Sequence, residues 1–125
     1  MESKTVELKT PAAPEFARSV RMLAANLAVV CGLSIDDVED VRMAAEEGFV
    51  YASATEQESV GIRFDINEDR IEMVFTLGAQ ANVEDAYEDG SFGYAQLILG
   101  AVTDEFSIDD EASTLTVVKT RGVSA

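Results

Sequence analysis

Glu47 and Tyr51 are the residues whose types and spacing point most directly to chemistry. They lie in the stretch EEGFVYA, residues 46–52, and a separation of four places both side chains on one face of a helix. A glutamate followed four residues later by an asparagine would indicate a magnesium–nucleotide site. With tyrosine at the second position, two interpretations stay open. The stretch is either such a site without its metal ligand or a solvated glutamate beside a packing tyrosine.

The remaining composition excludes several kinds of chemistry. The chain has no histidine and a single cysteine, Cys31, so the commonest catalytic base and a cysteine zinc site are both missing. Nucleophilic triads, zinc hydrolysis and redox chemistry are therefore not expected, and no metal site is predicted. Cys31 stands at the apolar end of a helical pattern, which predicts a small core residue.

The charge balance indicates the kind of partner. Nine basic residues against 24 acidic ones give a formal charge of −15, which repels nucleic acid and anionic membranes and attracts cationic partners. No apolar stretch is long enough to span a bilayer and no secretion signal is apparent. We expect a cytoplasmic protein that binds another protein, without nucleic acid or membrane.

The first half of the sequence predicts one strand and two helices within a single domain, residues 1–125. Residues 5–10 alternate as a strand does, Pro14 is suited to open a helix, and Gly32 to end it. Ser34 and Asp37 resemble a capping box for a second helix that runs to about Ala54. The apolar stripe of the first helix is Phe16, Val20, Leu23, Leu27 and Val30; that of the second is Val38, Val41, Ala45, Phe49 and Ala52.

The second half predicts a hairpin, a loop, a helix and two more strands. Residues 60–66 and 71–77 alternate around the polar NEDR, as an antiparallel hairpin does. Residues 78–90 predict a loop or lid, and residues 105–108 and 114–119 predict strands. The helix between them has an expected apolar stripe of Tyr94, Leu97, Ile98 and Ala101. The resulting fold class is α+β: a two-layer α/β sandwich with a mixed or antiparallel sheet covered by helices on one face.

This order of elements, with a glutamate late in a long helix and a glycine-led third helix, resembles the anti-sigma-factor serine kinases. These belong to the GHKL superfamily of histidine-kinase-like ATPases. The resemblance covers nearly the whole chain, from PEFARS to VVKTR. It implies that ATP would lie between the helices and a mobile lid, with magnesium as its metal. The family's glutamate helps to activate the attacking group, and Glu47 stands at its position as the catalytic candidate.

Several positions depart from the family's nucleotide site. Tyr51 stands where an asparagine binds magnesium, and a protonated phenol is a poor ligand for a hard cation. Thr76 stands where an aspartate reads adenine in Asp-x-Gly, with Gly78 retained. Ala95 stands where a phosphate-cradling glycine is expected. The resemblance thus implies a vestigial nucleotide pocket formed by Tyr51, Thr76, Gly78, Gly90, Gly93, Ala95 and Thr116.

The charge of the predicted lid agrees with a lost nucleotide site, since no Lys or Arg falls between Gly78 and Gly100 to welcome a triphosphate. Its acidic residues are Glu84, Asp85, Glu88 and Asp89. They are alternatively a solvated acidic loop.

Three functions stay open. The first is a regulatory domain that binds a sigma factor or an anti-anti-sigma partner and uses no cofactor. The second is an active serine kinase that binds Mg-ATP, and the third is an interaction domain for an unrelated partner. The resemblance also implies pairing through the first helix region. Because that helix's apolar stripe faces the sheet, any homodimer would need the first strand or the helix face with Ala17, Arg21 and Ala24.

Overall fold

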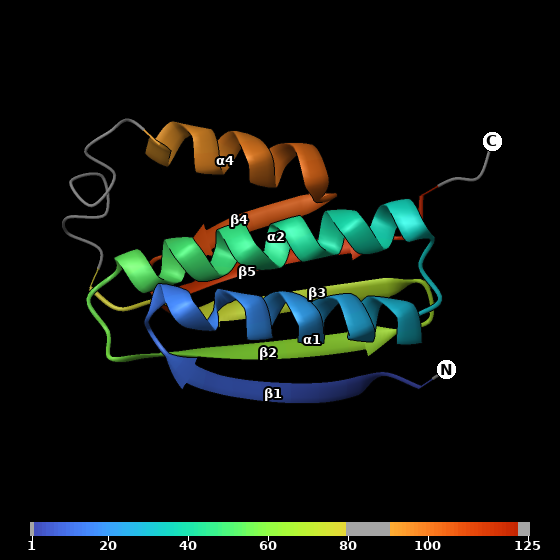
Figure 1. Cartoon of the computed structure of the whole chain (residues 1–125), viewed down its shortest axis with the longest axis horizontal. Coiled ribbons are helices and arrows are strands. Elements are labelled where there is room, and N and C mark those ends of the chain that lie inside the picture. The colour runs from blue at the N-terminus through green and yellow to red at the C-terminus, as the bar shows by residue number, and fades with distance from the viewer. Residues whose placement is uncertain (1, 80–90, 123–125) are drawn as a thin grey trace.

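The computed structural model describes residues 2–79 and 91–122, in which a five-stranded antiparallel sheet carries its helices on one face (Figure 1). The strand order is β1-β2-β3-β5-β4. The strands are β1 (Lys4–Pro11), β2 (Ser59–Asn67), β3 (Arg70–Thr76), β4 (Glu105–Asp109) and β5 (Thr114–Thr120). The helices are the short 3-10 helix η1 (Pro14–Phe16) and the α-helices α1 (Ala17–Val30), α2 (Ile35–Ala54) and α4 (Ser91–Val102). The predicted fold class is confirmed, and the sheet is antiparallel throughout.

The core lies between the sheet and the helices. Phe64 of β2 and Met73 of β3 are register partners, and both are almost wholly buried. Phe75 and Val117 continue this apolar surface across β3 and β5. Because side chains alternate along a strand, the residues between them project from the other face of the sheet, which none of the described helices covers.

Helix α1 packs as predicted except at its end. Val20 and Leu27 are buried, but Val30 is 51% exposed, so its assignment to the stripe was wrong. At 3.6 residues per turn the buried position after Leu27 falls on Cys31, which is 2% exposed. Ala24 is fully buried as well, which removes it from any free face of α1. The left-handed cap is confirmed, since Gly32 has φ +82°.

Helix α2 begins and ends where the sequence predicted. The Ser34 hydroxyl accepts the Asp37 N–H at 3.1 Å, which confirms the N-cap. A capping box would direct the side chain of Asp37 back to the start of α2. The Asp37 carboxylate instead accepts the N–H of Gly122 at 2.9 Å, next to β5. This contact fastens the first turn of α2 to the end of the last strand.

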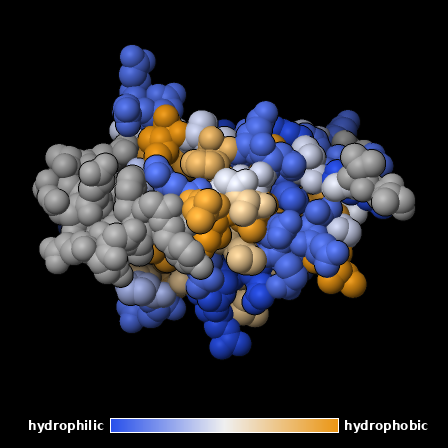
Figure 2. Space-filling model, turned by 90° about the horizontal axis from the view of Figure 1, so that it is seen from above, coloured by the Kyte–Doolittle hydropathy of each residue, from blue (hydrophilic) through white to orange (hydrophobic). Residues whose placement is uncertain are grey.

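Helix α4 buries only part of the predicted stripe: Ile98 is half-buried and packs against the core, but two other predicted positions do not. Leu97 is 68% exposed and Ala101 is exposed, whereas Leu99 and Val102 are buried. The segment is apolar nearly all round, so periodicity could not choose its buried face. Seen from above, apolar surface gathers near the middle of this side of the molecule (Figure 2). The side chain of Tyr94 lies outside the described residues.

Among the described helices, none is long and apolar enough to cross a membrane.

Candidate functional site

The last turns of α2 carry Glu47 and Tyr51 on one helix face. Tyr51 is buried, with 4% of its surface exposed, and Glu47 is half-buried. Burial raises the pKa of Tyr51, and the carboxylate of Asp110 raises it further. The phenol therefore stays protonated at neutral pH, and its ring is part of the core beneath the helix layer.

Glu47 has a less ordinary environment. Burial raises the pKa of its carboxyl group, and the neighbouring carboxylate of Glu46 raises it further. A raised pKa weakens the preference of this carboxyl group for its ionised form at neutral pH, which suits a group that accepts and returns a proton. Glu46 is held in an ion pair with Arg21 of α1 at 2.7 Å.

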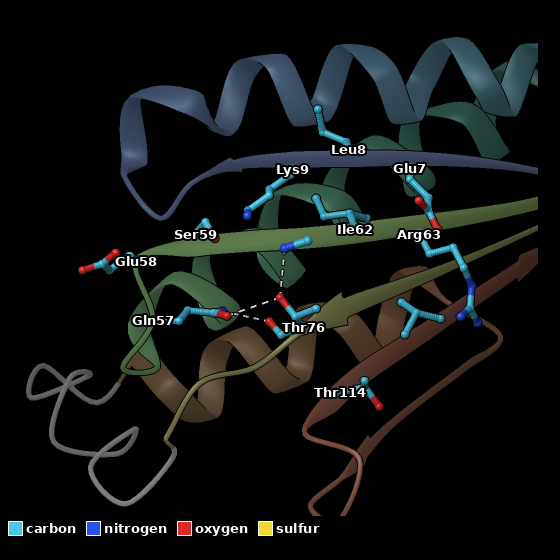
Figure 3. Close-up of a pocket in the computed structure, with 12 residues that line it drawn as sticks. Glu7, Leu8, Lys9, Gln57, Glu58, Ser59, Ile62, Arg63, Thr76 and Thr114 are labelled. Atoms are coloured by element: carbon cyan, nitrogen blue, oxygen red, sulfur yellow. Dashed lines mark hydrogen bonds between the residues drawn. The ribbon is translucent and has the colours of Figure 1, made fainter.

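Thr76 ends β3 with its side chain turned away from α2. The preceding residue, Phe75, is buried on the helix side of the sheet. Because side chains alternate along a strand, Thr76 projects from the opposite face. There its hydroxyl accepts the N–H of Gly61 at 2.8 Å and donates to the side-chain carbonyl of Gln57 at 3.2 Å. The residue at the adenine-reading position is thus occupied with contacts on the uncovered face (Figure 3).

Gly78 fits against the end of α2. A Cβ at this position would lie 2.1 Å from the carbonyl oxygen of Glu56, a distance no side chain tolerates. Its N–H donates to the hydroxyl of Thr55 at 2.8 Å. Close packing of two backbones therefore accounts for this glycine independently of any nucleotide.

The other predicted pocket residues are divided between two places. Thr116 is the register partner of Val74 and projects from the uncovered face, as Thr76 does. Gly93 and Ala95 lie in the first turns of α4, on the helix side of the sheet. Gly90 and the acidic residues Glu84, Asp85, Glu88 and Asp89 lie outside the described residues. The structure thus brings Tyr51 and Gly78 to the end of α2 but directs Thr76 and Thr116 to the other side.

No group of three or more metal-ligating side chains occurs within residues 2–79 and 91–122.

Sequence reasoning missed a hollow on the uncovered face. It has a volume of about 690 Å³ and lies across β1, β2, β3 and the start of β5 (Figure 3). Strand alternation could have shown that Lys9, Gly61 and Thr76 share this face, but not that Gln57 reaches it from beyond α2. Its lining residues are Glu7, Leu8, Lys9, Gln57, Glu58, Ser59, Gly61, Ile62, Arg63, Val74, Thr76 and Thr114.

Comparison with known proteins finds sequences similar to the chain among serine-protein kinases. It is 28% identical over 111 residues to the serine-protein kinase RsbW of Bacillus licheniformis, an alignment that covers 83% of this chain and 63% of the relative. It is 31% identical over 91 residues to RsbW of Halalkalibacterium halodurans, which covers 70% of this chain and 56% of that one. The chain is thus similar to RsbW serine-protein kinases over most of its own length. The resemblance inferred from its element order is confirmed.

The RsbW of Bacillus subtilis gives a similar result, with 28% identity over 109 residues. The chain spans about 63% of the length of this relative and of the RsbW of Bacillus licheniformis. No family model matches the chain.

Proposed function

We propose that this chain is a regulatory domain of the anti-sigma type, which holds a sigma factor or an anti-anti-sigma protein by surface contacts and does not turn over ATP. The observation that carries the proposal is the burial of Tyr51. Its ring fills the position from which the resemblance expects an amide to bind magnesium. A partner of a sigma factor would act in the cytoplasm, where transcription takes place.

The residues at the nucleotide positions fit Mg-ATP poorly. A buried, protonated phenol is a weak donor to magnesium, which prefers carboxylate, carbonyl and water oxygens. The Thr76 hydroxyl is engaged by Gly61 and Gln57 on the opposite face of the sheet. These residues therefore do not support phosphoryl transfer from Mg-ATP.

Charge favours a partner with a basic surface. At −15 the chain attracts cationic surfaces over a distance of about 8 Å in physiological salt. Association with a basic partner should therefore slow as salt is added, whereas an apolar contact would be indifferent to it.

Two measurements test the proposal. Calorimetric titration with Mg-ATP at millimolar concentration should show weak binding or none, and low micromolar affinity would contradict a dead site. Mixing with purified sigma-type and anti-anti-sigma proteins should give a complex without nucleotide. In the same mixtures Glu47→Gln should leave complex formation unchanged, because a binding module does not use this carboxylate as a base.

The retained Glu47 favours a second candidate, an active serine kinase like its RsbW relatives. Glu47 stands at the sequence position where the resemblance expects the catalytic glutamate, and its raised pKa suits a base. This candidate requires phosphate transfer from ATP to a serine of the partner, with loss of transfer in Glu47→Gln. Under our proposal neither the parent chain nor Glu47→Gln transfers labelled phosphate from ATP to the partner. Labelling by the parent chain alone would establish the kinase.

A further inference from the structure

The outer surface of the helix layer carries large apolar side chains that the core does not use. Within the part of the chain that the structure describes, every exposed side chain of this kind lies on α1, α2 or α4, and none lies on a strand. These residues are Met22, Val29, Val30, Ile35, Met43, Val50 and Leu97. Exposed apolar side chains gathered on one side of a domain, unlike single scattered ones, indicate a docking surface.

Two methionines stand on neighbouring helices of this surface. Met22 and Val29 are two turns apart on α1, and Met43 and Val50 are two turns apart on α2, so each pair lines one outward face of its helix. The two helices pack side by side on the sheet (Figure 1). We call the area formed by these four residues the methionine surface.

An ion pair between the helices shows that both halves of the methionine surface lie close together. The Arg21 guanidinium of α1 is 2.7 Å from the Glu46 carboxylate of α2. Met22 follows Arg21 directly in the chain, and Met43 lies about one turn before Glu46. The two thioethers therefore belong to one surface that spans both helices.

The charges around the methionine surface favour a basic partner. Helices α1 and α2 together carry six carboxylates, all of them on α2, and three arginines, while α4 has no charged residue. Lys119 of β5 pairs with Asp37 at 3.7 Å and with Asp40 at 3.1 Å. Carboxylates still outnumber cations after this lysine is included. A partner with Lys or Arg beside its own apolar side chains complements such a surface.

Methionine suits a docking surface and also makes it sensitive to oxidation. Its flexible thioether adapts to the shape of a partner. Met22 is 60% exposed and Met43 is 43% exposed, whereas Met73 in the core is 1% exposed. Hydrogen peroxide transfers one oxygen atom to an accessible thioether sulfur, which gives methionine sulfoxide and water. Because the sulfoxide is polar, each oxidised sulfur removes apolar surface from the contact.

We infer that the methionine surface holds an amphipathic helix of a partner protein, with apolar residues on one side and Lys or Arg beside them, and that peroxide releases this helix by oxidising Met22 and Met43. An apolar stripe along two packed helices matches the shape of such a segment. This role presupposes the partner-binding function proposed above, and it adds where the partner sits and what removes it.

Binding measurements before and after mild treatment with hydrogen peroxide test both parts. One probe is a purified sigma-type protein, and the other is a synthetic amphipathic helix made of lysine and leucine. Mass spectrometry should find Met22 and Met43 converted to the sulfoxide well before the buried Met73. Once both are converted, each probe should bind the parent about tenfold more weakly or less.

Two double variants separate the sulfurs from other targets of peroxide. Met22→Gln with Met43→Gln imitates the polarity of the sulfoxide and should weaken both probes without any oxidant. Met22→Leu with Met43→Leu keeps the surface apolar and removes both sulfurs, so it should bind as the parent does and ignore peroxide. Neither pair changes the charge of the chain, so general attraction to a basic probe stays the same. Circular dichroism identifies any variant that fails to fold.

Several results would overturn the inference. They are a parent that does not bind the lysine–leucine helix, a complex with either probe that survives oxidation of both sulfurs, and a leucine variant that peroxide releases as readily as the parent. Self-association of the parent that the glutamine variant abolishes would also do so, because a second copy would then occupy the surface.

Failure of the proposed function gives a different result. In that case neither a sigma-type nor an anti-anti-sigma protein binds the parent in any state, while the lysine–leucine helix binds and peroxide releases it. The docking surface would then stand, with a partner of another kind.

Discussion

Gly48 of α2 lies directly against the ring of Phe75 of β3, so that a Cβ added at Gly48 would stand 2.6 Å from both Cε1 and Cζ of that ring. Both residues are buried, and Phe75 is fully inaccessible. The missing side chain lets the middle of a helix approach the sheet at a large aromatic residue. Glycine in the middle of a helix is unfavourable by up to about 1 kcal/mol relative to alanine, so the close contact must offset that cost.

Gly48→Ala should therefore lower the free energy of unfolding in spite of the better helix propensity of alanine. Overpacking a core costs about 1–3 kcal/mol, and the ring of Phe75 that the new Cβ would meet is fully buried. Urea unfolding of the variant measures the loss. Combining Gly48→Ala with Phe75→Leu should recover part of it, and a Gly48→Ala protein as stable as the parent would contradict the close contact.

Removing the ring of Tyr51 should cost much more stability than neutralising Glu47. Tyr51→Ala removes a buried aromatic side chain, a change that costs about 3–5 kcal/mol in a core. Tyr51→Phe keeps the ring and removes only the hydroxyl, so it distinguishes the stability contributed by ring packing from that contributed by the hydroxyl. Denaturant melts of both variants beside the parent give the comparison. Equal stability of Tyr51→Ala and the parent would refute the interpretation of this residue as filling a lost pocket.

Glu47→Gln should slightly stabilise the chain at neutral pH. The pKa of Glu47 is raised in the folded state, because burial and then Glu46 disfavour its charge. A carboxyl group of this kind destabilises the fold once it is ionised, and the penalty disappears as pH falls below its unfolded pKa. The gain should stay below about 1 kcal/mol for a half-exposed group. The free energies of unfolding of Glu47→Gln and the parent should differ at pH 7 and converge at pH 4. A gain that persists at pH 4 would show that the stabilisation has another cause.

Asp37 should show the opposite pH dependence. The Gly122 N–H holds the pKa of its carboxyl group below the usual range; burial opposes this, while Ser34 and Lys119 act in the same direction as Gly122. The stabilisation is complete above the unfolded pKa of about 4 and is lost as pH falls through the lower folded value.

Asp37→Asn should therefore destabilise the chain by about 1–3 kcal/mol at pH 7, with a smaller difference in acid. Chemical denaturation across that range measures it. Asp36→Asn, one residue away on the exposed side of α2, is the control and should change little at either pH. A pH-independent loss in Asp37→Asn would show that the charge of this residue is not what holds Gly122.

Thr76→Val should leave nucleotide binding as it is and lower stability by about 1 kcal/mol, the usual contribution of such hydrogen bonds. The change removes the hydroxyl that joins Gly61 and Gln57 and keeps the branched side chain. Thr76→Asp alone should not create an adenine site, because the new carboxylate would start from the uncovered face of the sheet. Calorimetry with ATP and urea unfolding of both variants check these outcomes. Any adenine binding gained by Thr76→Asp would contradict this orientation.

The sequence predicted the strands and the long helices well, because each has a clear period. Alternation at Val60 to Ile66 marks a strand with one buried face, and the start of α2 follows from its N-cap Ser34. Helix α4 was found but its orientation was not. Leu97 and Leu99 are both apolar, and only the position of α2 and β4 decides that Leu99 is the buried one.

The candidate site was less predictable for a different reason. The resemblance supplies positions in the chain, whereas the direction of a side chain at a strand end depends on the pleat of its neighbours. Thr76 follows the buried Phe75 and is therefore turned away from α2, a fact that the spacing Thr-x-Gly does not contain. The role of the seven pocket residues as a nucleotide remnant stays a prediction.

The bridge between Glu56 and Ala79, which brings Gly78 against the end of α2, also closes the β2–β3 hairpin into a ring. Each of the two backbone N–H groups donates to the carbonyl of the other residue. At the far end of this ring, the turn is fastened to α1, since the Asp69 N–H donates to the carbonyl of Cys31 at 2.9 Å. Because the hairpin is held both at its open end and at its turn, neither strand can separate from the other on its own. The amides in the middle of β2 and β3 should therefore exchange with solvent only when the whole chain unfolds.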